Sequence, residues 1–228
     1  MRYLIGPEGR QQFLKEPLGT PIIVDVLRAS STIVAALWAG AAEVIPVEDA
    51  VEAFKIGKKM NAVLVGERGG VKLEGFDYNN SPSEMLGANI RGKTVVISTS
   101  HGTKIMVDGG VIGSTLNAGA VAEYVMPLDR TYLLASSPTR SEEDLDAACI
   151  IELIALMLGA GRFMYEAERH VQNDAQCQEI FDGIRHSEAG ERVARLGYQE
   201  DVEMICTQVN VFPIVPLYKN GSIKSYER

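Results

Sequence analysis

The chain contains few cysteines. Only Cys149, Cys177 and Cys206 occur among its 228 residues. The number is odd and no two of them form a Cys-x-x-Cys pair, which excludes a disulfide framework and a zinc site built on cysteine pairs. We expect unpaired, buried or incidental thiols, as are typical of proteins in a reducing compartment.

Basic residues and long apolar runs are also scarce. Lys and Arg together number 22 against 30 Asp and Glu, so the net charge is −8. This acidic balance argues against nucleic acid or an anionic membrane as the main partner. The N-terminal segment turns polar after Gly6-Pro7, unlike a signal peptide, and the most apolar stretch, residues 149–161, is too short to cross a bilayer. We therefore expect a cytoplasmic protein.

Several common catalytic motifs are missing. The chain has no Gly-x-x-x-x-Gly-Lys-Ser/Thr loop, no well-placed Gly-x-Gly-x-x-Gly and no Gly-x-Ser-x-Gly elbow. No cysteine precedes an arginine by six residues, and Asp25 is not followed two residues later by a second aspartate. These absences exclude P-loop enzymes, cysteine-dependent phosphatases and the usual aspartate-nucleophile pattern.

Short apolar runs alternate with helical patterns over the first 136 residues. Residues 21–27 form a nearly unbroken apolar run, typical of a strand that is buried on both faces. Residues 48–60 carry acids early and two lysines late, as a helix dipole favours. The alternation predicts an α/β fold with a mainly parallel sheet between helices. Further strands are expected at residues 43–47, 62–66 and 93–99, with helices at residues 30–39 and 102–107 and continued alternation over residues 110–136.

The last third of the chain has a different character. Residues 141–195 are mostly helical in pattern, beginning with the capping sequence Ser-Glu-Glu-Asp at residues 141–144. The last apolar run, residues 209–217, is interrupted by Pro213 and Pro216, which predicts an edge strand or an extended tail. No Pro/Ser-rich linker divides the chain, so we expect a single domain over residues 1–228. Symmetric homo-oligomers are common, so a homo-oligomer remains open.

The first of three polar clusters follows the strand predicted at residues 21–27. Asp25 lies within the apolar run, Arg28 follows it, and Ser30, Ser31 and Thr32 begin a helix. Ligands of open α/β sheets bind at the carboxyl ends of strands, and a helix N-terminus with hydroxyls and a nearby arginine suits a phosphate. A buried ionised aspartate requires compensation by a metal or by hydrogen bonds. The structural alternative is that Asp25 pairs with Arg28 and Ser30 only caps the helix.

The second cluster also follows a predicted strand. Glu67 offers hard oxygen ligands that suit Mg²⁺, and Arg68 offers a second clamp for phosphate. Farther on, Asn80, Ser81 and Pro82 resemble an N-cap followed by proline in the first helical turn. The alternative is an ordinary polar turn with a cap.

The third cluster is Ser100, His101, Gly102 and Thr103, again between a strand and a helix. The hydroxyls and the helix N-terminus can hold an oxyanion, and His101 can act as acid or base near neutral pH. The alternative is a capped turn with a surface histidine. Together the three clusters suit metal-assisted transfer of a phosphoryl group to water.

These residues resemble the 2-phosphosulfolactate phosphatase family, in order and over nearly the whole chain. Members usually carry Asn at the position of His101 and Gly at the position of Asn79. The resemblance implies a three-layer α/β/α sandwich and Mg²⁺-dependent hydrolysis of 2-phosphosulfolactate, a step of coenzyme M biosynthesis. The matching segments are VDVLRASSTI at 24–33, GERG at 66–69, GFDYNNSP at 75–82, TSHGT at 99–103, SEED at 141–144, LG at 196–197, ED at 200–201 and VP at 215–216.

With this resemblance we expect Asp25 and Glu67 to bind Mg²⁺, with Asp144 or Glu143 as a further ligand or water-orienting base. Arg28, Arg68 and the residue 30–32 turn would hold the phosphate, and the turns at residues 80–81 and 100–103 would complete its cradle. Asp25 as a nucleophile that forms a phospho-aspartate remains open.

Two other functions also remain open. One is a phosphatase for another small phospho-acid, and the other is a non-catalytic binding protein for a phosphorylated or sulfonated metabolite. A sulfonate requires a further cationic or amide-lined subsite, for which Lys104 or an arginine beyond Ser136 is available.

Overall fold

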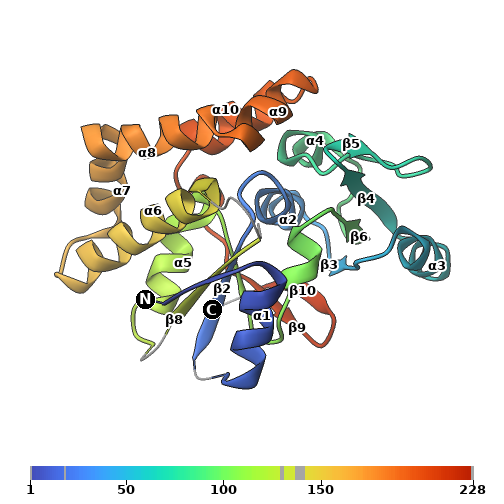
Figure 1. Cartoon of the computed structure of the whole chain (residues 1–228), viewed down its shortest axis with the longest axis horizontal. Coiled ribbons are helices and arrows are strands. Elements are labelled where there is room, and N and C mark those ends of the chain that lie inside the picture. Colours follow the sequence, from blue (N-terminus) through green and yellow to red (C-terminus); the bar gives the residue numbers. More distant parts are fainter. Residues whose placement is uncertain (1, 18, 129–130, 137–141, 227–228) are drawn as a thin grey trace.

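A computed structural model describes the chain except for residues 1, 18, 129–130, 137–141 and 227–228 (Figure 1). In this part of the chain, ten strands form one sheet, in the order β1-β8-β2-β7-β9-β10-β3-β6-β4-β5. The strands are β1 Arg2–Ile5, β2 Thr20–Val24, β3 Glu43–Pro46, β4 Val63–Arg68, β5 Val71–Lys72, β6 Thr94–Ser98, β7 Val111–Gly113, β8 Thr131–Ala135, β9 Pro216–Lys219 and β10 Ser222–Ser225.

The helices connect these strands and form most of the last third of the chain. The α-helices are α1 Gly6–Lys15, α2 Ala29–Trp38, α3 Ala50–Met60, α4 Pro82–Gly87, α5 Ala118–Val125, α6 Glu142–Gly159, α7 Met164–Asn173, α8 Ala175–His186, α9 Glu188–Arg195 and α10 Gln199–Thr207, with short 3₁₀ helices at η1 Gly102–Ile105 and η2 Thr115–Asn117. The predicted α/β sandwich with a mainly parallel sheet and a helical C-terminal third is confirmed.

The sheet consists of two parallel groups joined by an antiparallel hairpin. Strands β1, β8, β2 and β7 run parallel to one another, as do β3, β6 and β4. The hairpin β9–β10 lies between the two groups, pairing β9 with β7 and β10 with β3. Within the run predicted as an edge strand or an extended tail, residues 209–215 lie outside strands and helices, and residues 216–217 begin β9. The predicted edge position is wrong, because β9 lies inside the sheet. Pro216 is tolerated because it is the first residue of β9, where a missing N–H disturbs the ladder least.

Local sequence explains the elements nearest the site. Ile22, Ile23 and Val24 of β2 are fully buried, as an inner parallel strand requires. Helix α4 begins with Ser81 as N-cap, whose Oγ accepts a hydrogen bond from the Glu84 N–H, and with Pro82 in its first turn, as predicted. Both residues therefore begin a helix.

Three further expectations concern the rest of the chain. The short helix predicted at residues 102–107 is the 3₁₀ helix η1. The predicted cap before α6 includes Ser141, which lies outside the described residues. All three cysteines are unpaired. Within the described part of the chain, no helix is both long and apolar enough to cross a membrane.

Helices α8, α9 and α10 lie along the top of the view in Figure 1, above α2 and α6. Helix α10 packs on α8, α9 and α4, and α6 packs on α5, α7 and α8. The C-terminal helices thus form a layer of their own beside the helices that pack on the sheet, and α9 and α6 contribute side chains to the cavity described next.

Candidate functional site

A cavity of about 190 Å³ lies beside the carboxyl end of β2. Asp25 follows β2 directly and is 6% exposed, with its side chain on the cavity wall. The turn before η1 and the N-terminal parts of α6 and α9 supply the other walls. The lining residues are Asp25, Leu27, His101, Ser136, Glu142, Glu143, Ser187, Glu188, Ala189 and Arg192.

The backbone comes very close to the carboxylate of Asp25. Its Oδ1 accepts a hydrogen bond from the Ala29 N–H at 3.2 Å, at the beginning of α2. On the other side, a β-carbon at position 102 would lie 2.5 Å from Asp25 Oδ2 and 2.5 Å from the Ala29 side chain. Only glycine permits this approach, so Gly102 is required to bring η1 and His101 beside the carboxylate.

The surroundings of three carboxyl groups near the cavity raise their pKa values and so disfavour their ionised forms. Burial raises the pKa of Asp25, with a further rise from Glu67 that the nearby His101 partly offsets. Burial, followed by the charge of Asp25, raises the pKa of Asp144 well above its usual value and also raises that of Glu143. A bound cation would relieve this mutual repulsion.

Asp144 fastens helix α6 to the ends of two strands. Its Oδ1 accepts a hydrogen bond from the Val26 N–H at 2.7 Å, and its Oδ2 accepts from Ser136 N at 3.1 Å and Ser136 Oγ at 2.8 Å. Asp144 is 2% exposed and is not one of the residues that line the cavity.

Glu67 organises the turn between β4 and β5. Its Oε1 accepts from Ser100 N at 2.7 Å, and its Oε2 accepts from Gly70 N at 2.7 Å and Ser100 Oγ at 3.0 Å. Arg68 donates to the carbonyl oxygens of Glu67 and Glu48 and to Ser98 Oγ. Both side chains thus bind protein groups in the structure, and neither lines the cavity.

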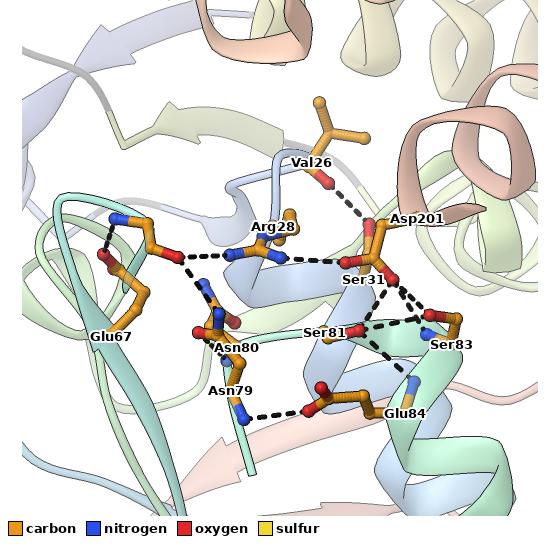
Figure 2. Close-up of polar contacts among 11 residues, drawn as sticks. Val26, Arg28, Ser31, Glu67, Asn79, Asn80, Ser81, Ser83, Glu84 and Asp201 are labelled. Atoms are coloured by element: carbon orange, nitrogen blue, oxygen red, sulfur yellow. Dashed lines mark hydrogen bonds and ion pairs between the residues drawn. The ribbon is translucent and has the colours of Figure 1, made fainter. Parts of the chain in front are cut away.

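Arg28 belongs to a buried network that joins α2, α4 and α10 (Figure 2). Its Nη1 donates to Asp201 Oδ2 at 2.9 Å, its Nη2 donates to Gly70 O at 3.3 Å, and its guanidinium lies 4.5 Å from the Tyr198 ring centre. Arg28 and Asp201 are 2% and 0% exposed. The partner of Arg28 is therefore Asp201, and the alternative pairing with Asp25 is wrong.

Asp201 also holds the beginning of α4. Its Oδ1 accepts hydrogen bonds from Ser81 Oγ at 2.8 Å, Ser83 N at 3.1 Å and Ser83 Oγ at 2.7 Å. Asn79 donates to the same Gly70 carbonyl as Arg28, at 3.0 Å, and its backbone N–H donates to Glu84. Figure 2 shows these groups converging on Arg28 and Asp201 from three segments that are distant in sequence.

The predicted hydroxyl cradle is mostly internal. Ser30 Oγ donates to Asp25 O at 2.8 Å, and Ser31 Oγ donates to Val26 O at 2.7 Å and contacts Ser114 Oγ at 2.8 Å. Thr103 bonds within its own turn, to Thr99. In the described chain, Thr32 Oγ1 and Asn80 Oδ1 are buried without a hydrogen-bond partner.

The structure therefore divides the predicted residues into two groups. Asp25 and His101 line the cavity, with Gly102 and Asp144 beside them, whereas Arg28, Glu67, Asn80 and Ser81 belong to the neighbouring network. Three residues of these groups were not singled out from the sequence: Ser136, Arg192 and Asp201. Two sequence signals pointed to Asp201: the segment at residues 200–201 that matches the family, and a carboxylate beside the apolar Val202 and Ile205 of a helix, where a buried acid needs partners.

The side chains near the cavity can be compared with the ligands that Mg²⁺ usually binds. Among the described residues, no three His, Cys, Asp or Glu side chains form a group that could hold a metal ion, so a site shared by Asp25, Glu67 and Asp144 stays a prediction. Mg²⁺, however, commonly uses one or two carboxylates and takes its other ligands from water and phosphate. Asp25 and Glu143 both line the cavity, and two such carboxylates suit this mode of binding.

Comparison with known proteins identifies the family. Residues 7–221 match the family model described as 2-phosphosulpholactate phosphatase. Proteins named "Probable 2-phosphosulfolactate phosphatase" are similar over most of their length. That of Carboxydothermus hydrogenoformans is 36% identical over 86% of this chain and 84% of its own. Those of Thermotoga maritima and Clostridium tetani are 37% and 34% identical, over 89% of this chain and 90% and 91% of their own. The chain belongs to the 2-phosphosulfolactate phosphatase family of phosphoric monoester hydrolases.

Proposed function

We propose that this protein is a Mg²⁺-dependent phosphatase that hydrolyses 2-phosphosulfolactate to sulfolactate and phosphate, as a step of coenzyme M biosynthesis in the cytoplasm. The family membership and the names of the relatives support the reaction. The observation that carries the proposal is the buried Asp25 at the carboxyl end of β2, on the wall of a cavity that it shares with His101 and Glu143. Unpaired cysteines fit a reducing compartment.

Asp25 and Glu143 are the residues that would hold Mg²⁺. Burial raises the pKa of both carboxyl groups, and a bound cation would supply the positive charge that favours their ionised forms. When Mg²⁺ is bound, the site gains a positive charge that neutralises phosphate oxygens and helps to orient water. The Ala29 N–H and Gly102 hold the Asp25 carboxylate in place for this role.

The other protein groups position the ester for hydrolysis. In the reaction, the hydroxyl of water bonds to phosphorus, the bond from phosphorus to the lactate oxygen breaks, and the proton passes to that oxygen. His101, on the cavity wall beside Asp25, can donate a ring N–H to a phosphate or leaving-group oxygen. Asp144 and Ser136 keep α6, and with it Glu143, against the ends of β2 and β8. Such positioning and charge neutralisation provide most of the catalysis in phosphoryl transfer.

The test is release of inorganic phosphate from 2-phosphosulfolactate by the full chain, with Mg²⁺ and with EDTA, beside phospholactate and phosphoglycolate. We expect turnover that requires Mg²⁺ and favours the sulfonate, and a loss of more than about 100-fold in Asp25→Asn. Tight binding without turnover would contradict the proposal in favour of a binding protein. A trapped phosphoenzyme that Asp25→Asn abolishes would instead make Asp25 a nucleophile.

A further inference from the structure

The cavity has an unusual balance of charge for an enzyme that acts on a polyanion. Its described lining residues include four carboxyl side chains, those of Asp25, Glu142, Glu143 and Glu188, but a single guanidinium, that of Arg192. A substrate that carries a phosphate, a carboxylate and a sulfonate cannot enter such a cavity without cationic partners for its charges. If Mg²⁺ binds at Asp25, one partner is provided for the phosphate, and a second is still needed.

Arg192 reaches the cavity from helix α9. Glu188, Ala189 and Arg192 lie on one face of this helix because they are three and four residues apart, and all three line the cavity. Arg192 therefore lies on the part of the cavity wall that α9 supplies, whereas Asp25 lies on the part at the end of β2.

The guanidinium of Arg192 is available to a ligand, unlike those of its neighbours. Within the described residues the Arg192 guanidinium makes no hydrogen bond or ion pair, and the residue is exposed to solvent. On helix α8, Arg185 binds Asp182 and Glu203. On helix α9, Arg195 binds Glu191 at 3.2 Å. Arg192 alone of these three faces the cavity and leaves its donors open.

The other cations considered for an anion subsite are placed elsewhere. Arg28 is held by Asp201 and Gly70, and Arg68 by the carbonyls of Glu67 and Glu48. Lys104 is exposed on η1 and does not line the cavity. Among the cations of the described residues, the choice that the sequence left open is thus decided by which helix face points into the cavity, whereas Arg140 lies outside the described residues.

We propose that Arg192 is the specificity-determining residue of this enzyme and that its guanidinium binds the sulfonate of the substrate. This inference rests on the proposed function for the identity of the substrate. The planar guanidinium donates two parallel hydrogen bonds to an oxyanion, which suits the three equivalent oxygens of a sulfonate. The phosphate then lies toward Asp25 and the sulfonate toward α9, so the two anionic ends of the substrate span the cavity between the sheet and the C-terminal helices.

The test compares two substrates that differ in the sulfonate. In Arg192→Gln we expect the KM for 2-phosphosulfolactate to rise by about 10- to 100-fold, the range for loss of a hydrogen bond to a charged group, with a smaller change in kcat. The KM for phospholactate, which has no sulfonate, should change by less than about threefold. Arg192→Lys should recover part of the affinity, since it keeps the charge but not the two parallel hydrogen bonds. Arg195→Gln, one turn farther on and bound to Glu191, is the matched control and should behave as the wild type.

A binding measurement separates this inference from the proposed function. Calorimetry with sulfolactate, the expected product, should show binding to the wild type and at least about tenfold weaker binding to Arg192→Gln. If the wild type lacks turnover but this difference persists, the proposed reaction fails and the assignment of Arg192 stands. If turnover is normal and Arg192→Gln discriminates the two substrates as the wild type does, or loses both equally, the assignment of Arg192 is wrong.

Discussion

Asp25 and Asp144 place two carboxyl groups in nearly complete burial at the end of β2. Their folded-state pKa values are raised, for Asp25 by burial and by Glu67, and for Asp144 by burial and by Asp25. The folded protein therefore binds more protons than the unfolded chain once the pH exceeds the ordinary aspartate value. The stability that these groups contribute is present at low pH and is lost as the pH rises through their folded-state pKa values.

The first prediction follows from this loss of stability as the pH rises. In EDTA, Asp25→Asn should have a higher melting temperature than the wild type at pH 8, and the difference should shrink as the pH falls toward 5. The asparagine keeps the Oδ1 that accepts from Ala29 N–H but removes the buried charge. Each kcal/mol of added stability should raise the melting temperature by about 2–4 °C in a chain of this size. Thermal unfolding followed by circular dichroism measures the difference.

Asp49→Asn is the matched control. Asp49 caps α3 at the surface by accepting from Val51 N–H, and asparagine caps equally well, so its melting temperature should follow that of the wild type at every pH. A difference in melting temperature between Asp25→Asn and the wild type that does not change with pH would contradict the assignment of a buried charge to Asp25.

The second prediction concerns His101. If its contribution is a donated N–H, His101→Asn should keep turnover within about tenfold of the wild type, because an amide also donates, whereas His101→Ala should lose about 10- to 100-fold. The asparagine variant matches the residue that the family usually carries. Initial rates at saturating substrate decide the point. Equal losses in both variants would show that His101 transfers a proton, which asparagine cannot do.

At the scale of single elements, the attachment of α10 depends on one buried carboxylate. Asp201 accepts hydrogen bonds from Arg28, Ser81 and Ser83, and Tyr198 just before α10 packs against the same guanidinium. The C-terminal helices are thereby fixed to α4 and to the beginning of α2. This connection also determines where α9, the neighbour of α10, meets the cavity.

The third prediction tests this attachment. Asp201→Ala should lower the free energy of unfolding by about 3–5 kcal/mol, because it leaves the Arg28 guanidinium buried without its counter-ion. Glu200→Ala, the adjacent exposed residue of the same helix, should change it by less than about 0.5 kcal/mol. Urea denaturation gives both values.

A double variant shows the source of the loss in Asp201→Ala. Combining Arg28→Met with Asp201→Leu should recover much of the lost stability, because it removes both charges. A loss in the double variant equal to the sum of the losses in Arg28→Met and Asp201→Leu alone would mean that the two side chains do not stabilise each other, which would contradict the role of the ion pair in this attachment.

At the scale of the whole molecule, the C-terminal hairpin joins the two parallel halves of the sheet. Strand β9 pairs with β7 at Leu217 and Val111, and β10 pairs with β3 at Ile223 and Val44. Ile223 is fully buried, and the large cluster of buried apolar side chains extends from Leu4 to Ile223. Strands from the first and last quarters of the chain therefore meet only when the C-terminal residues are in place.

The fourth prediction compares the centre of the sheet with its edge. Ile223→Ala should lower the free energy of unfolding by about 2–5 kcal/mol, the usual cost of deleting a fully buried isoleucine side chain to alanine. Val71→Ala, on the edge strand β5 with 59% exposure, should change it by less than about 0.5 kcal/mol. Chemical denaturation measures both. Similar, small effects of the two substitutions would show that the hairpin is not part of the cooperative core.

Much of the architecture could be predicted from local sequence patterns. The apolar run that contains β2, the acids and lysines of α3 and the Ser81-Pro82 start of α4 each reflect nearest-neighbour physics and appear in the structure as expected. The hairpin at residues 216–225 could not be predicted, because prolines near an apolar run normally indicate an edge. Its place between β7 and β3 depends on the gap that the other strands leave.

The sequence alone thus determined the alternation of strands and helices, the family, and the chemical types of residue that follow the strands. Only the tertiary structure decided which of these residues meet. Asp25 and His101 share a cavity with Glu143 and Arg192, while Arg28 and Ser81 bind Asp201. The reason is physical: strand and helix formation depends on local periodicity, whereas the partner of a buried charge depends on which surfaces remain after the sheet and the C-terminal helices pack together.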